Sequence, residues 1–186
     1  LNNNQENLSL DQLEREASGM NLILRLKVGR PLNLWTLRLV VAEQIQDQRI
    51  RVLGEMKAWA YPGKRGLQLD TMKVLPKTNC KVGPLIWAAT MTWALEKTPC
   101  RQARLLAIRD EPIKHAKLTR YFKWQGFRTV RDVGSNPTDL PLRLVWGGSD
   151  SLMIAKCDHV LEKNYLRWAN RKRCEVINNL PRDNYF

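Results

Sequence analysis

The chain has 186 residues, 44% of them hydrophobic, so it can bury one substantial core but is short for two ordinary domains. Lys and Arg outnumber Asp and Glu by 31 to 18, and the formal charge of +13 favours an anionic partner without choosing among phosphate-rich ligands, nucleic acids and acidic proteins. No apolar run approaches the roughly 20 residues of a membrane-spanning helix, and the opening residues lack the pattern of a secretory signal peptide.

The first eight residues, LNNNQENL, are polar and rich in asparagine. Ser9, followed three residues later by Gln12, resembles a capping box before a short charged helix. We therefore expect residues 1–19 to form an N-terminal tail, residues 20–158 to form the domain, and residues 159–186 to form a basic C-terminal helix and tail.

Four segments with alternating apolar residues follow the tail. The pattern predicts strands near residues 20–28, 34–43, 50–61 and 67–76, separated by turn-forming residues. The second segment has the periodicity of either a helix or a strand, and its β-branched pair favours a strand. Short connections between successive strands predict an antiparallel meander.

The second half of the chain alternates helices with strands. Pro84 suits the first turn of a buried apolar helix that continues to about Thr98, and residues 103–108 form a short apolar strand. Asp110 suits the N-cap of a helix ending at Gly126, and strand-like segments follow. The expected class is α/β (α+β), with one mixed, mostly antiparallel sheet flanked by helices.

The order of elements between residues 67 and 133 carries a resemblance. The segments LDTMKVLP, KTNCKVGPLIWAA, ARLLAI and LTRYFKWQGF form a strand, a loop with the start of a helix, a strand, and a helix ending at Gly-Phe. In this order they resemble the GNAT superfamily of acyltransferases, and the upstream VVAEQIQDQRIRVLGEMKAWA resembles the family's preceding hairpin. The sequence also looks similar to proteins of cyanobacterial and plastid lineages, which implies a cytoplasmic or plastid-stromal location. Because the sequence starts at Leu1 rather than at a methionine, it leaves open whether a targeting segment originally preceded it.

The resemblance implies that the loop and the helix start bind acetyl-coenzyme A. A helix N-terminus with small residues can bring backbone N–H groups close to a pyrophosphate. Asn79 stands where the family has Arg or Gln, and Pro84 removes one N–H donor. A solvated loop with ordinary surface lysines is the alternative. The implied cofactor residues are Val74, Leu75, Lys77, Lys81, Val82 and Gly83.

Acyl transfer also needs a base for the amine and an acid for the departing thiolate. Asp70 or Glu55 could accept the amine proton, although either could instead be a solvent-facing strand residue. The family's acid is a Tyr at a position that corresponds here to Phe122, so Tyr121 lies one residue away and about 100° around the helix. His115 could contact the cofactor or lie on the helix surface.

The segment after residue 158 reads as an amphipathic basic helix. Its cations could bind nucleic acid or an acidic protein, or could simply form a solvated face over an apolar stripe. The cations are Lys163, Arg167, Arg171, Lys172 and Arg173.

Metal binding is not expected, because the sequence has two histidines and no CxxC pair. Its four cysteines are expected to be reduced packing residues. They are Cys80, Cys100, Cys157 and Cys174.

Two functions follow from these patterns. The first is a GNAT-like N-acyltransferase that transfers an acetyl group from acetyl-CoA to an amine. The second is a GNAT-like interaction or assembly module that has lost catalysis and uses a basic surface.

Overall fold

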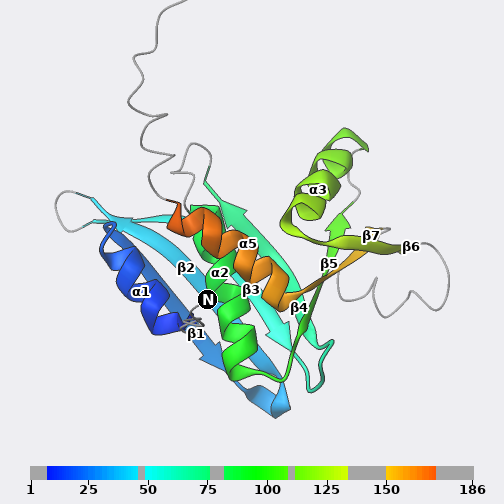
Figure 1. The fold of residues 1–186 in the computed structure, drawn as a ribbon, viewed down its shortest axis with the longest axis horizontal. Helices are drawn as coiled ribbons and strands as arrows, with labels where there is room; N and C mark the ends of the chain where they lie inside the picture. Colours follow the sequence, from blue (N-terminus) through cyan, green and yellow to red (C-terminus); the bar gives the residue numbers. More distant parts are fainter. Residues whose placement is uncertain (1–7, 46–48, 76–81, 109–111, 134–149, 171–186) are drawn as a thin grey trace, which may run out of the picture.

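The computed structural model describes residues 8–45, 49–75, 82–108, 112–133 and 150–170. Within them, seven strands form one sheet in the order β1-β2-β3-β4-β5-β7-β6 (Figure 1). The strands are β1 Leu22–Gly29, β2 Trp35–Gln44, β3 Ile50–Ala60, β4 Leu67–Val74, β5 Gln102–Ile108, β6 Arg128–Val133 and β7 Asp150–Lys156. The helices are α1 Leu10–Ser18, the short 3-10 helix η1 Pro31–Asn33, α2 Val82–Lys97, α3 Pro112–Gln125 and α5 Cys157–Ala169.

The first four strands form the predicted antiparallel meander. Their apolar residues alternate as expected, and Leu39, Met56 and Ala58 are all nearly inaccessible to solvent. These side chains point toward α2, and the polar residues between them point to the opposite side of the sheet. The prediction of a single mixed, mostly antiparallel sheet flanked by helices is confirmed, and the elements after Leu67 follow the predicted order of strand, helix, strand, helix and strand.

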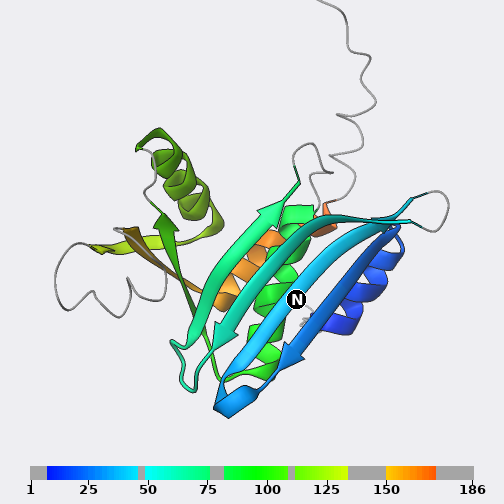
Figure 2. The ribbon, with the colours of Figure 1, turned by 180° about the vertical axis from the view of Figure 1, so that it is seen from behind.

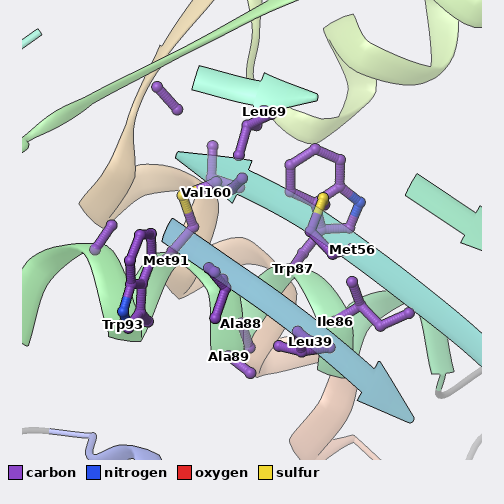
Figure 3. Close-up of a cluster of buried hydrophobic side chains, with 14 of the residues drawn as sticks. Leu39, Met56, Leu69, Ile86, Trp87, Ala88, Ala89, Met91, Trp93 and Val160 are labelled. Carbon is purple, nitrogen blue, oxygen red and sulfur yellow. The ribbon is translucent and has the colours of Figure 1, made fainter. Parts of the chain in front are cut away.

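Helix α2 is the centre of the core. Its residues are apolar on every side, which is typical of a helix buried all around. The sheet lies behind it and α5 lies in front (Figure 1). Trp87, Met91 and Trp93 are each about 1% exposed or less, and Figure 3 shows Trp87 on the side of Met56 and Leu69. The predicted buried helix is therefore confirmed.

Gly54 lets α2 approach the sheet closely. A Cβ atom at this position would lie 2.8 Å from Ile86 Cδ1, 2.9 Å from the Lys73 carbonyl oxygen and 3.2 Å from Val82 Cγ1. Any larger residue would push the first turns of α2 away from β3 and β4. The position of the α2 N-terminus thus depends on this glycine.

The helices at the two ends of the chain belong to the same core, which differs from the predicted division. Helix α1 begins at the predicted N-cap Ser9, yet it buries Leu13 and Ala17 completely rather than lying in a tail. Helix α5 buries Val160 and Trp168 against α2 and is continuous with β7. Each segment has enough apolar residues on one face to cover part of α2 or the sheet, so residues 10–18 and 159–169 pack as parts of the domain.

The structure continues past β4 with a second, smaller layer. Helix α3 covers β5 and β6 and is separate from the layer that α1, α2 and α5 form over the first four strands (Figures 1 and 2). Among the described helices none is both long and apolar enough to cross a membrane.

Candidate functional site

Strands β4 and β5 are parallel neighbours that pair only where they begin. The two pairs are Leu67 with Ala103 and Gln68 with Arg104. Beyond these pairs the strands separate toward their carboxyl ends (Figure 2). The later peptide groups of β4 on this side therefore have no β5 ladder partner, and the sheet is open at its middle.

A cavity of about 560 Å³ lies at the carboxyl end of β4. Its volume is within the range of sites that hold small molecules and cofactors. Three residues predicted for the site, Glu55, Val74 and Leu75, are among its lining residues, and Val74 and Leu75 are 39% and 47% exposed. The described lining residues are Val52, Leu53, Gly54, Glu55, Met72, Lys73, Val74 and Leu75.

The N-terminus of α2 lies next to this cavity, because Gly54 lines the cavity and packs against Val82. Val82 is buried, whereas a Cβ atom at Gly83 would meet no atom of the described residues within 4 Å. The first turn has no acidic residue. Open space beside Gly83 and the positive end of the helix dipole together suit an anion.

Part of the predicted cofactor site lies outside the described residues. This applies to Lys77, Asn79 and Lys81, which belong to the segment between β4 and α2.

Asp70 is the extra residue of a β-bulge. Lys57 pairs with Thr71 and Ala58 pairs with Leu69, so β4 has one more residue than β3 at this point. The Asp70 side chain is exposed, and its Oδ2 accepts a 3.1 Å hydrogen bond from Thr71 Oγ1. Bulges redirect side chains, and this one turns a carboxylate outward just where β4 leaves β5.

Glu55 is held by two cations. Its carboxylate oxygens lie 3.6 Å from Arg38 Nη2 and 3.9 Å from Lys73 Nζ, and the side chain is 21% exposed. Both carboxylate oxygens of Glu55 are therefore engaged by cations of the neighbouring strands.

The Tyr121 side chain points inward from α3. Its hydroxyl accepts a 2.8 Å hydrogen bond from Nε1 of the buried Trp87 on α2. The Trp87 ring also contacts Phe122 and Phe127, with ring centroids 6.4 Å and 5.6 Å away. Sequence reasoning missed Trp87 as a partner, since a tryptophan within an apolar run shows burial but not the direction of its N–H group.

His115 lies on α3 over β6 and β7. Its Nε2 is 3.4 Å from both Thr119 Oγ1 and Ser151 Oγ, and the Ser151 hydroxyl donates a 2.6 Å hydrogen bond to Asp132. His115 and Tyr121 therefore come from the same helix but have separate contacts. Glu55, Val74 and Leu75 share one cavity.

The basic residues of α5 that fall in the described part of the chain contact α3. The Arg167 guanidinium stacks 3.3 Å from the centroid of the Trp124 ring and donates to Gln125 Oε1 at 3.0 Å. Lys163 Nζ is 5.9 Å from the same ring. Burial lowers the pKa of Arg167, and the nearby Tyr121 opposes this shift. Arg167 thus joins two helices. The other predicted cations, Arg171, Lys172 and Arg173, lie outside the described residues.

The described residues contain no group of three or more His, Cys, Asp or Glu side chains that could hold a metal ion. Cys100 and Cys157 are free, buried thiols. Burial, with a smaller effect of Cys100, raises the pKa of Cys157 to about 12. The two remaining cysteines, Cys80 and Cys174, lie outside the described residues.

No protein-family model matches the sequence, and no curated protein matches it. Several solved structures are similar in fold. A nucleotide-linked sugar GNAT, FdhC in its apo form, has a TM-score of 0.48 and 7% identity over 72% of this chain and 64% of the other, less than two thirds of its length. The PaiA N-acetyltransferase from Thermoplasma acidophilum, in complex with coenzyme A, has a TM-score of 0.43 and 16% identity over 78% and 70% of the two chains. Nourseothricin acetyltransferase has a TM-score of 0.45 and 13% identity over 74% and 88%.

Proposed function

We propose that this protein binds acetyl-CoA at the carboxyl end of β4 and transfers the acetyl group to an amine. The observation that carries the proposal is the separation of β4 from β5 beside a cavity of about 560 Å³. The pantetheine arm of coenzyme A is a narrow chain with two amide groups. Peptide groups of β4 beyond its two ladder pairs with β5 can exchange hydrogen bonds with such amides as a neighbouring strand would.

The pyrophosphate would lie at the start of α2. Pro84 has no N–H group, so the donors that remain in the first turn include those of Val82, Gly83 and Leu85. The space beside Gly83 permits close approach of a phosphate to the backbone. Lys77 and Lys81, which precede α2 in the sequence, would supply positive charge.

Asp70 and Tyr121 would handle the protons. The amine nitrogen attacks the thioester carbonyl carbon, Asp70 accepts the amine proton, and the carbon–sulfur bond breaks. The departing thiolate takes a proton from Tyr121. Because the Tyr121 oxygen accepts its hydrogen bond from Trp87, the Tyr121 O–H hydrogen is available for donation.

Calorimetric titration with acetyl-CoA tests the first step. We expect binding to the wild type, loss of binding in Gly83→Trp, and unchanged binding in Leu166→Trp, which places the same ring at an exposed position of α5. If the wild type does not bind millimolar acetyl-CoA, the proposal is wrong.

Acetylation of a panel of small amines tests the second step. We expect Asp70→Asn to lower kcat with little change in acetyl-CoA affinity, and to shift the pH profile. Unchanged rates would remove Asp70 from the role. Binding of acetyl-CoA without acetylation of any amine would reject acetyl transfer and favour a binding module.

A further inference from the structure

The sheet has one face that no described helix covers. Figure 2 shows β1 to β4 from this side, with the helices behind them. Residues on this face alternate with core residues such as Leu39 and Met56. We refer to it as the helix-free face.

Three cations lie side by side across the helix-free face. Lys27 on β1 is directly opposite Arg38 on β2, and Arg38 is directly opposite Lys57 on β3. All three are exposed. Adjacent strands are about 4.8 Å apart, so the row places three positive charges within roughly 10 Å.

This arrangement costs stability. Like charges directly opposite one another in an antiparallel sheet are destabilising. Arg38 has a partner in Glu55, but within the described residues neither Lys27 nor Lys57 forms an ion pair. An anionic ligand that neutralises these three positive charges would explain why the sequence keeps a destabilising row of cations.

The next row of the same face supplies different chemistry. Thr36 is opposite Trp59, Trp59 is opposite Gln68, and Gln68 is opposite Arg104. Trp59 is partly exposed, with its ring centroid 6.1 Å from that of Tyr61. Arg104 Nε is buried and has no hydrogen-bond partner in the described part of the chain. This row therefore places a partly exposed aromatic ring beside the row of cations.

The charge of the helix-free face is strongly positive. Its carboxylates are Glu55 and, at the bulge, Asp70. Its cations in the rows of β1 to β5 are Arg25, Lys27, Arg38, Lys57, Lys73 and Arg104, of which Arg25 forms an ion pair with Glu14 of α1.

We propose that the helix-free face binds single-stranded nucleic acid. The phosphates lie along Lys27, Arg38 and Lys57, and an unpaired base stacks on Trp59. Single strands alternate anionic phosphates with flat bases, which matches a row of cations beside an aromatic ring. Heparin, an acidic protein or an anionic membrane would use the cations but not the ring, and duplex DNA keeps its bases stacked inside. This inference does not depend on acetyl-CoA binding.

Fluorescence anisotropy with the full chain and a labelled oligouridylate tests the proposal. Oligothymidylate, a duplex of equal length, heparin and phosphatidylserine vesicles serve as comparison ligands. We expect both single strands to bind more tightly than the duplex and heparin, with affinity falling as salt rises. Tighter binding of the duplex, of heparin or of the vesicles would overturn the proposal, as would no binding at low salt.

Two matched double variants locate the site. Lys27→Gln with Lys57→Gln removes two charges from the row, and Lys117→Gln with Lys123→Gln removes two exposed charges from α3. The first should lower the slope of log affinity against log salt by about 1.4, at about 0.7 for each lost phosphate contact. The second should leave that slope unchanged. Equal effects of the two variants would place binding elsewhere.

Trp59→Leu tests the stacking contact. We expect oligouridylate affinity to fall roughly fivefold to a hundredfold, as for loss of one stacked base, while heparin binding is unchanged. Thermal unfolding of every variant identifies those that have lost their fold. The double variant at Lys27 and Lys57 should be at least as stable as the wild type, because it removes like charges that face one another. Its weaker binding would therefore reflect lost contacts with the ligand. An unchanged oligouridylate affinity in a folded Trp59→Leu protein contradicts the proposal.

Discussion

The indole N–H group of Trp87 on α2 donates a 2.8 Å hydrogen bond to the hydroxyl of Tyr121 on α3. This bond joins the layer that covers β1 to β4 with the layer that covers β5 and β6. It satisfies a donor that would otherwise be buried without a partner, and it fixes the direction of the phenol proposed as the acid.

The variant Tyr121→Phe should lose stability, because the ring packing remains but the Trp87 N–H loses its acceptor. An unsatisfied buried donor costs about 1–3 kcal/mol. Urea unfolding measures the loss, and the double variant with Trp87→Phe is the control. Since that variant removes both partners, its loss should be smaller than the sum of the two single losses. Strict additivity would show that the hydrogen bond contributes nothing.

The two glycines beside the candidate site should respond in opposite ways to alanine. Gly54→Ala forces a Cβ atom against Ile86 and the Lys73 carbonyl, so we expect a loss of about 1–3 kcal/mol and weaker acetyl-CoA binding. Gly83→Ala adds a methyl group to open space in a helix, so no loss of stability is expected. Thermal unfolding checks both variants. A stable Gly54→Ala protein would mean that α2 can shift without cost.

The Arg167 contact with Trp124 should contribute more to stability than the Lys163 contact. Arg167→Gln removes a guanidinium 3.3 Å from the ring centroid, and Lys163→Gln removes an ammonium at 5.9 Å. Cation–π contacts contribute about 0.5–2 kcal/mol and need close approach. We therefore expect the arginine variant to unfold at lower urea concentration than the lysine variant. The reverse order would show that Arg167 is a surface charge free for a partner.

Stability should fall at alkaline pH because of Cys157. Burial raises its pKa from 9.0 to about 12, so the unfolded chain loses the thiol proton first. The contribution of the Cys157 thiol to the free energy of unfolding is fully present below pH 9. It declines between pH 9 and about pH 12, by about 1.4 kcal/mol per pH unit. The Cys157→Ala variant lacks the thiol and therefore its pH-dependent contribution, while all other groups still titrate as in the wild type. The difference in unfolding free energy between wild type and variant should therefore change with pH only above pH 9, and a constant difference would contradict the assignment.

The strands and the buried helix could be predicted because their signals are local. Alternation marks β1 to β4, and Pro84 with an unbroken apolar run marks α2. The packing of α1 could not be predicted in this way. Leu13 and Ala17 form only a sparse apolar stripe in a polar segment, and they become part of the core only when the sheet is present.

The position of the cavity could be predicted better than its details. The sequence pattern brought Val74 and Leu75 to the end of a strand beside a helix start, and the structure has a cavity there. The ion pairs of Glu55 depend on strand register, because Arg38 and Lys73 are far from it in sequence. The direction of Tyr121 depends on how α3 packs against α2, which helical periodicity alone does not determine.

The bulge at Asp70 sets the phase of the rest of β4. With the extra residue, Met72 pairs with Met56 on the core side and Lys73 pairs with Glu55 on the opposite side. A chain one residue shorter here would turn the Lys73 ammonium into the apolar layer beneath α2 and move Met72 into water. The number of residues in β4 is therefore constrained as tightly as their chemistry.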